Sequence, residues 1–381
     1  MHPHSPDIEN WLKLAGAAGV GPVTFGKLLD YFGSPQGALG ASAYELAKVE
    51  GIGLHTAEKI ASSRNKINAA AEIELAEKLN VWLIHLHDER YPALLKQIYD
   101  PPPVLYIKGT LAEQDNLSVA IVGSRRCSLY GSEQASRFAH ILAAAGFTIC
   151  SGLARGIDTA AHQGALAAGG RTIAVQGCGL ANVFPPENQK LFDSIAESGA
   201  CVSELPLRYE PLAENFPPRN RIIAGLSLGT IVIEAGGNSG AIHTAKAALD
   251  YNREVMAVPG KIDSPLSRGA NKLIKEGAKL VDCVEDIMES LGYVGDKIRG
   301  HVNQKADALT EKAEMPLFDI AQLNLNTSEK SVYECLNSEP AHIEQVIADS
   351  QLPAGNVNAS IVSLRLKGLI KQLPGNMFVR K

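Results

Sequence analysis

The stretch IVGSRRCSLYG at residues 121–131 decides the fold. Its first residues are typical of a buried strand, and a glycine turn follows them. A strand that passes through such a turn into a helix is the usual opening of a nucleotide-binding α/β domain. Arg125 and Arg126 stand where a dinucleotide-binding loop has more glycine, so we expect an anion held from one side. We expect Arg125 to face that anion, while Arg126 could brace the loop.

Similar short strands recur along the chain from about residue 116 to 291. We expect strands at 117–123, 147–152, 171–177, 201–205, 229–235, 255–260 and 278–283. Helical patterns separate them, and nearly continuous apolar strands between helices predict a parallel sheet covered on both faces. The predicted fold class is therefore α/β, with a Rossmann-like, doubly wound, mainly parallel sheet. Ligands of such sheets bind at the carboxyl ends of the strands.

Two smaller domains flank this sheet in the sequence. Residues 1–80 predict an all-α, SAM-like domain, in which glycine turns at Gly19 and Gly51 indicate a duplicated helix-hairpin-helix. Such turns can bind a phosphate through backbone amides, or they can simply pack two helices together.

The remaining boundaries follow from composition. Residues 81–292 form a connector followed by the Rossmann-like domain, residues 293–325 a polar linker, and residues 326–381 a winged-helix domain. We expect Ser328 to cap the first helix of the winged helix. Winged helices bind DNA in some proteins and other proteins elsewhere, and both functions stay open here.

The composition is that of an ordinary soluble protein, with 45% hydrophobic and 20% charged residues. No apolar run reaches the roughly 18 residues of a membrane span, and the N-terminus lacks the pattern of a secretory signal. The six cysteines form no CxxC pair, which favours reduced thiols in the cytoplasm and no metal site. The net charge of −5 argues against non-specific coating of nucleic acid but allows a local basic groove.

Six loops at the expected strand ends combine glycine or serine with basic residues. Free backbone N–H groups near helix starts favour anions. A mononucleotide needs about two such loops, so six predict a phosphate chain that runs along the edge of the sheet. The basic residues of these loops are Arg125, Arg126, Arg155, Arg219, Arg221, Lys246, Arg268 and Lys272. Lys246 could alternatively lie on a solvated helix face.

Some of these residues also have a structural interpretation. Arg155 could pair with the nearby Asp158, which could itself cap a helix. A glutamate at the end of a strand, Glu204, could orient an arginine rather than act as an acid. Arg219 and Arg221 lie near a helix start, where the helix dipole disfavours cations, and this mismatch favours a functional role.

Several motifs in the same order resemble those of the DNA-processing protein A (DprA/Smf) family. They are IVGSRRCSLYG, SGLARGIDTAAH, FPPRNRIIAGLS, EAGGNSGAIHTAKAAL and VPG…SRGANKLIKEGA. The resemblance extends to YPALLKQIYDPPPVLYIKG and the helical N-terminus. It implies a cytoplasmic bacterial protein that binds single-stranded DNA, protects incoming DNA during natural transformation and loads the recombinase RecA. It also implies a homodimer formed through the Rossmann-like domain.

The resemblance assigns residues to the DNA site. Those expected to hold a phosphate or to line the same groove are Gly123, Ser124, Arg125, Arg126, Arg219, Arg221, Ser239, Gly240 and Lys246. The chain departs from the family pattern at Gln176, Phe184, Ala241 and His243, which leaves the details of base stacking open. Aromatic candidates are few, so phosphate contacts should dominate, with little sequence preference and a strong salt dependence.

An enzyme is the competing interpretation. AGGNSGAIH can be aligned with the P-G-G-x-G-T-x-x-E motif of the lysine-decarboxylase-like phosphoribohydrolases, which hydrolyse nucleotides on a related fold. His243 then falls where that motif has its catalytic glutamate. We therefore expect binding without catalysis, with no catalytic residue, no cofactor and no metal.

Overall fold

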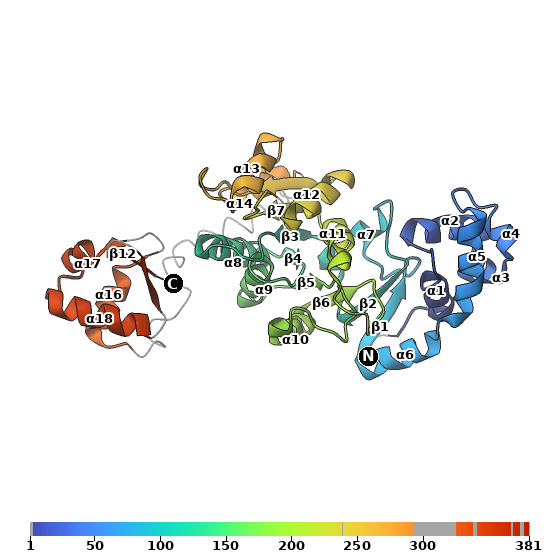
Figure 1. Ribbon diagram of the computed structural model, residues 1–381, viewed down its shortest axis with the longest axis horizontal. Coiled ribbons are helices and arrows are strands. Elements are labelled where there is room, and N and C mark those ends of the chain that lie inside the picture. The colour runs from blue at the N-terminus through green and yellow to red at the C-terminus, as the bar shows by residue number, and fades with distance from the viewer. Residues whose placement is uncertain are drawn as a thin grey trace. The chain divides into compact units, whose positions relative to one another are not determined.

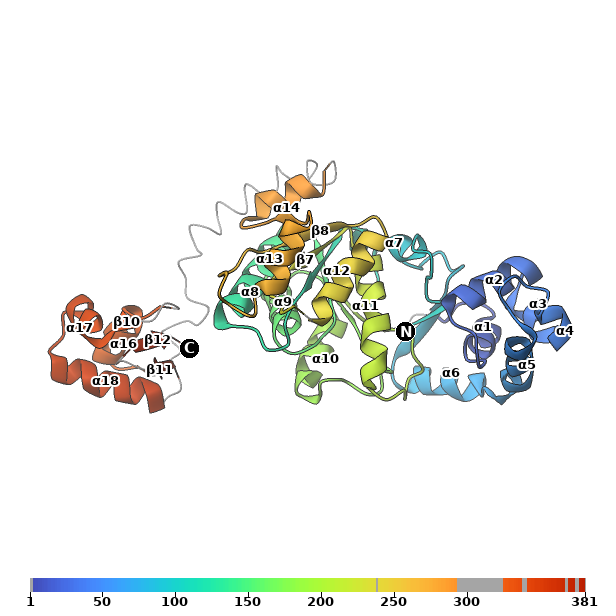
Figure 2. The same ribbon diagram turned by 45° about the horizontal axis from the view of Figure 1, so that its top comes forward.

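The computed structural model describes residues 3–237, 239–292, 325–337, 341–366, 369–373 and 377–380. The chain divides into two compact units, residues 1–305 and 306–381, and each is described by itself. In the first unit a helical domain lies beside a domain built on a large sheet (Figures 1 and 2). The predicted linker lies outside the described residues except for Leu325.

Six α-helices form the described part of the N-terminal domain. They are α1 (Ile8–Ala15), α2 (Pro22–Phe32), α3 (Pro35–Gly40), α4 (Ala43–Leu46), α5 (Leu54–Ser63) and α6 (Ala69–Lys78). Gly19 and Gly51 precede α2 and α5 with φ of 89° and 81°, a conformation that glycine adopts without strain. Phe25 and Ile60 from these two helices are fully buried. The two predicted glycine turns therefore each start a helix.

The sheet has the strand order β1-β2-β6-β5-β4-β3-β7-β8-β9. Its strands are β1 (Val81–His85), β2 (Val104–Gly109), β3 (Ser118–Val122), β4 (Thr148–Ser151), β5 (Thr172–Val175), β6 (Ala200–Ser203), β7 (Gly229–Val232), β8 (Glu254–Ala257) and β9 (Lys279–Leu280). The pairs β1–β2 and β2–β6 are antiparallel and all others are parallel. This confirms the doubly wound, mainly parallel sheet.

The chain reverses its direction across the sheet at β3. It first builds β4, β5 and β6 on one side of β3, and then returns to place β7 on the other side. In open α/β sheets, ligands bind where the strand order reverses, outside the carboxyl ends of the strands. The topology therefore points to the loops that follow β3 and β7, and the opening stretch is the first of them.

Helices cover the sheet. They are α7 (Ala93–Lys96), α8 (Leu129–Ala144), α9 (Ile157–Ala167), α10 (Gln189–Ser198), α11 (Phe216–Gly225), α12 (Gly240–Asp250), α13 (Arg268–Lys275) and α14 (Val284–Ser290). Helices α8 and α9 pack together, and so do α11 and α12. Val122 of β3, Ile222 of α11 and Ala245 of α12 belong to one buried core, which fixes the starts of α11 and α12 near the end of β3.

The second unit is the predicted winged helix. It contains α16 (Thr327–Glu334), β10 (Ala341–His342), α17 (Ile343–Ser350), α18 (Ala354–Leu366), β11 (Ile370–Leu373) and β12 (Met377–Arg380). The expectation for its first helix is wrong in one detail. Asn326, not Ser328, caps α16, because Asn326 and Glu329 form reciprocal hydrogen bonds.

Among the described helices, none is both long enough and apolar enough to span a membrane.

Candidate nucleic-acid interface

A cavity of about 700 Å³ lies at the carboxyl ends of β3 and β7. We call it the strand-end groove. Its lining includes Gly123, Ser124, Arg125, Arg126, Asp158, Phe184, Phe216, Arg219, Asn220, Ser239, Gly240, His243 and Thr244. The groove thus collects residues from the loops and helix starts that follow β3, β4, β5, β6 and β7.

The loop after β3 is fixed by backbone contacts on both sides. Ser124 N–H donates to the Glu234 carbonyl at 2.7 Å, and the Ser124 carbonyl accepts from Ile157 N–H at 3.3 Å. A Cβ on Gly123 would lie 2.5 Å from Ile157 Cγ1, so this position needs glycine. The loop is therefore anchored to β7 and α9, while Arg125 and Arg126 remain exposed.

The start of α8 is occupied by a carboxylate from the protein itself. Glu234 is 6% exposed and accepts hydrogen bonds from Ser128 N–H at 2.8 Å and from Ser128 Oγ at 2.6 Å. The amide at this helix start is thus not available to a ligand. Glu234 was not predicted from the sequence; its signal is an acid two residues after β7, the strand that neighbours β3.

The loop after β4 is likewise filled by an internal carboxylate. Asp158 is buried and accepts from the N–H groups of Gly152 at 3.1 Å and Ala154 at 3.4 Å. Burial raises the pKa of Asp158 to about 6, against the opposing effect of Arg219. Asp158 does not cap α9 as expected, because Gly156 is the residue that precedes the helix.

Arg155 does not pair with Asp158, the structural interpretation considered from the sequence. Its guanidinium forms an ion pair with Glu187 rather than with Asp158, and both side chains are about half exposed. Arg155 is also not among the residues that line the strand-end groove. An exposed pair of this kind places the arginine on the surface beside the groove.

The structure places Arg219 beneath the groove and not on its open surface. Arg219 is 4% exposed, and its Nη1 donates to the carbonyls of Gly152, at 2.7 Å, and Val175. Burial lowers the pKa of Arg219, while Asp158 raises it. A cation is disfavoured near a helix start, but the Arg219 guanidinium bonds to carbonyls at the ends of β4 and β5. These contacts explain why an arginine stands near the start of α11. Pro217 also stands in the first turn of α11 and offers no N–H to an anion.

The expectation that Arg221 lines the same groove is wrong. Its guanidinium is buried between Glu204 and Asp100, with Nε 3.5 Å from Asp100 Oδ2 and Nη1 donating to the Asp100 carbonyl at 2.6 Å. Arg221 lies outside the groove lining. Glu204 orients an arginine, which is the structural alternative considered from the sequence.

Two aromatic rings line the groove beside the exposed arginine. The ring centroids of Phe184 and Phe216 lie 5.5 Å apart. The Arg125 guanidinium lies 5.0 Å from the Phe216 centroid, within the range of a cation–π contact. This surface combines a cation with aromatic area, the two features that single-stranded nucleic acids bind.

The start of α12 supplies a further wall. Ser239 caps this helix by accepting from Ala241 N–H at 3.4 Å, and Asn220 Nδ2 donates to the Gly240 carbonyl at 3.2 Å. The second bond links α11 to α12 across the groove. Ser239, Gly240 and the exposed His243 all line the groove.

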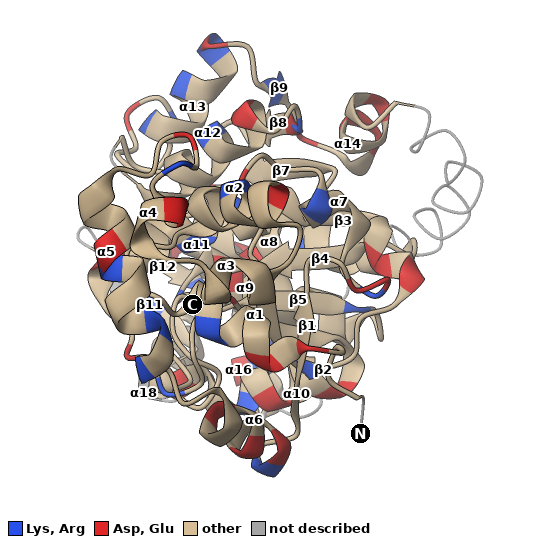
Figure 3. Ribbon diagram, turned by 90° about the vertical axis from the view of Figure 1, so that its right-hand side faces the viewer, with Lys and Arg blue, Asp and Glu red and all other residues tan. Residues whose placement is uncertain are grey.

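Three predicted basic residues lie outside the groove lining on the neighbouring helices. Lys246 is exposed on α12, and Arg268 and Lys272 are exposed on α13. Lys272 Nζ lies 3.5 Å from Glu276 Oε1 on the same helix. Figure 3 shows lysine and arginine positions in blue along α12 and α13. We call the exposed side chains of these three residues the outer basic surface, and none of them lines the groove.

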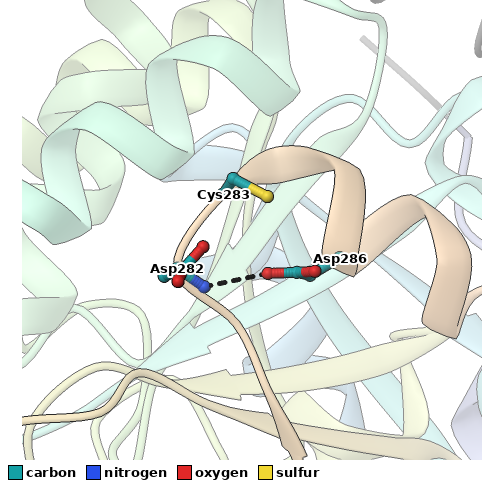
Figure 4. A group of neighbouring side chains, drawn as sticks. All are labelled: Asp282, Cys283 and Asp286. Atoms are coloured by element: carbon teal, nitrogen blue, oxygen red, sulfur yellow. Dashed lines mark hydrogen bonds between the residues drawn. The ribbon is translucent and has the colours of Figure 1, made fainter.

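One group of metal-ligand residue types occurs in the described part of the chain. Asp282, Cys283 and Asp286 lie at the start of α14, with one ligand atom of each within 4.8 Å of the others (Figure 4). Asp286 accepts from Asp282 N–H at 3.1 Å, so its carboxylate is held by the residues just before the helix. This local hydrogen bond accounts for the position of the Asp286 side chain.

The fold and the groove define a Rossmann-like protein with a basic, aromatic-lined site at the carboxyl edge of its sheet. Three family models match the chain in domain order. They are the DprA-like N-terminal HHH domain at residues 7–57, DNA recombination-mediator protein A at 82–292 and the DprA winged helix domain at 319–376. The chain belongs to the DNA recombination-mediator protein A family.

Individual relatives agree with this assignment. Protein Smf of Synechocystis sp. is 36% identical over 391 residues, which cover 97% of this chain and 98% of that protein. DNA processing protein DprA of Streptococcus pneumoniae is 45% identical over 206 residues, which cover 54% of this chain and 73% of that protein. An X-ray structure of the Streptococcus pneumoniae protein has a TM-score of 0.64 and 36% identity, and covers 74% of this chain and 97% of that chain.

Proposed function

We propose that this protein binds single-stranded DNA in the strand-end groove, mainly through phosphate contacts, and does no chemistry on it. The observation that carries the proposal is the pair of exposed arginines, Arg125 and Arg126, beside Phe184 and Phe216. In the described part of the chain, no salt bridge involves either arginine, so their charge is available to a phosphate. The name of the pneumococcal relative, a DNA processing protein, points the same way.

The path of the strand extends from the groove to the outer basic surface. Lys246, Arg268 and Lys272 would hold phosphates there, beyond the nucleotide held at Ser239 and Gly240. Because these are contacts to the backbone of the strand, they carry no base preference. The test is a titration of a labelled single strand, and of the duplex of the same sequence, across salt concentrations. We expect the single strand to bind at least about tenfold more tightly, with affinity falling steeply as salt rises.

The winged helix provides the control for this titration. A chain that ends before residue 326 should keep its preference for the single strand if the groove is the main site. Equal affinity for duplex and single strand in the full chain, lost in the shortened one, would place the main site on the winged helix instead.

Membership of the family supports a proposed biological role. In the cytoplasm, the bound protein protects incoming single strands during natural transformation and loads the recombinase RecA onto them, acting as a homodimer joined through the Rossmann-like domain. Light scattering of the purified protein tests the dimer. Assembly of recombinase filaments on a single strand, timed with and without this protein, tests the loading.

Nucleotide hydrolysis is the alternative function. His243 lines the groove where the phosphoribohydrolase motif has its glutamate, and Asp158 already accepts two backbone N–H groups. Both observations favour binding over catalysis. Incubation with nucleoside monophosphates tests this choice, because released base would establish the enzyme and overturn the binding-only proposal.

A further inference from the structure

Two glycines beyond the ends of β4 and β5 leave room for the first turn of α11. A Cβ on Gly152 would collide with the Arg219 guanidinium. A Cβ on Gly177 would lie 2.9 Å from Cδ1 of Phe216. Real Cβ atoms do not approach other atoms so closely, so a larger residue at either position would displace the Arg219 or Phe216 side chain.

Gly152 is held from both sides by buried charged groups. Its carbonyl accepts from Arg219 Nη1 at 2.7 Å, and its N–H donates to Asp158 at 3.1 Å. The same Nη1 donates to the Val175 carbonyl, so one guanidinium ties the end of β4 to the end of β5. Hydrogen bonds from a charged donor are strong where water does not compete for them.

The position of Arg219 leaves a phosphate little access to its charge. Although Arg219 contributes to the groove lining, it is 4% exposed, and its Nε is buried without a partner. Its guanidinium lies 5.8 Å from the ring centroid of Phe216, and that of Arg125 lies 5.0 Å from the same ring. Arg219 can therefore act on a ligand through Phe216, which the ligand can touch.

We propose that Arg219 is a positioning residue that holds Phe216 and the ends of β4 and β5 in the arrangement that a single strand binds, and that it contacts no phosphate itself. This inference rests on the proposed function, and it replaces the direct phosphate contact expected of Arg219 from the sequence. Arg125 is the direct contact.

The salt dependence of binding separates the two roles. Each phosphate contact contributes about 0.7 to the slope of log affinity against log salt for a single strand. We expect Arg125→Gln to reduce the magnitude of that slope by about 0.7. Arg219→Gln should weaken binding about tenfold or more with the slope unchanged, because no counterion release is lost. Arg253→Gln is the matched control, since Arg253 also donates to a backbone carbonyl, that of Leu94 at 2.9 Å, outside the groove lining.

The pH profile distinguishes positioning from a general loss of structure. Among the described residues, Arg219 and Arg125 are the charged groups that act on Asp158, with the thiols of Cys127 and Cys150 nearby. Loss of Arg219 raises the pKa of Asp158 further, because its countercharge is gone. The affinity of the wild type is itself expected to rise as Asp158 gains a proton, and in Arg219→Gln that rise should begin at a higher pH. Adding Asp158→Asn should remove that pH dependence and recover part of the affinity.

Arg219→Lys provides the test if the glutamine variant does not fold. Lysine keeps the charge, so it would preserve a direct phosphate contact, but it lacks the planar group of donors that lies against Gly152. A positioning role therefore predicts clearly weaker binding by Arg219→Lys. A slope reduced as in Arg125→Gln, or an affinity equal to that of the wild type, overturns the inference. If the wild type binds no single strand at all, the proposed function fails and the inference falls with it.

Discussion

Two pairs of arginines from the strand-end loops differ in what their guanidinium groups meet. Arg125 and Arg126 are exposed on a loop whose backbone is anchored by β7 and α9. Arg219 is buried against strand carbonyls, and Arg221, whose side chain is 11% exposed, lies between two carboxylates. The first pair is exposed at the groove, while the second pair forms contacts within the protein.

The difference follows from the edge of a parallel sheet itself. Helix starts at this edge expose N–H groups that attract anions, and the same strands end in carbonyls that attract cations. Glu234 accepts from an amide at the start of α8, Asp158 accepts from two amides of the loop after β4, and Arg219 donates to two carbonyls at the ends of β4 and β5. A basic residue in a strand-end loop can therefore either bind an anionic ligand or donate to carbonyls at the edge of the sheet.

The largest expected effect comes from removing Arg221 from its ion pairs with Glu204 and Asp100. Arg221→Ala leaves Glu204 and Asp100 without their partner, so we expect the free energy of unfolding to fall by about 3 kcal/mol in urea titrations. Arg126→Ala is the control, because an exposed arginine should leave stability unchanged. A loss no larger than the control's would show that Arg221 does not hold this part of the fold together.

The next effect removes the exposed pair. The variant with both Arg125→Ala and Arg126→Ala should bind a single strand roughly 30-fold more weakly at low salt, because two charge-assisted contacts to phosphate are lost. Its unfolding curve should match that of the wild type. Normal binding by this variant, measured by fluorescence anisotropy, would move the DNA site away from the groove.

A smaller effect depends on pH. The pKa of Asp158 is about 6 in the folded protein, above its ordinary value of 3.8, so this groove residue gains a proton as the pH falls from 7.5 to 5.5. A neutral Asp158 repels phosphate less, and wild-type affinity should rise a few-fold over that window. In Asp158→Asn the rise should disappear; a rise that persists would assign the proton to another group.

The smallest effect concerns Arg155. Arg155→Gln should change the affinity for a single strand by less than about twofold and leave stability unchanged, since its pair with Glu187 is exposed and outside the groove lining. A loss as large as that of the exposed pair would instead mean that the strand displaces Glu187 and binds Arg155.

The fold was predictable because its signals are local. Apolar strands separated by helical patterns identify the sheet, and the glycine turns at Gly19 and Gly51 identify two helix starts. The cap of α16 was misplaced because Asn326 and Ser328 are both good caps, and only the reciprocal bonds with Glu329 decide between them.

The site was predictable only in part, since its contacts are long-range. The convergence of the strand-end loops follows from topology, but the ion pair of Arg221 depends on Asp100, which is distant in the sequence. Arg219 depends in the same way on carbonyls at the ends of β4 and β5. A backbone carbonyl has no sequence signature, so the sequence could not distinguish this arginine from Arg125.

The central claim is that exposed arginines of the strand-end groove bind the phosphates of a single strand. Its most direct test compares the salt dependence of single-strand binding by the wild type and by the double variant Arg125→Ala, Arg126→Ala. The slope of log affinity against log salt is negative, and the loss of two phosphate contacts should reduce its magnitude by about 1.4. Equal slopes for the two proteins would contradict the account.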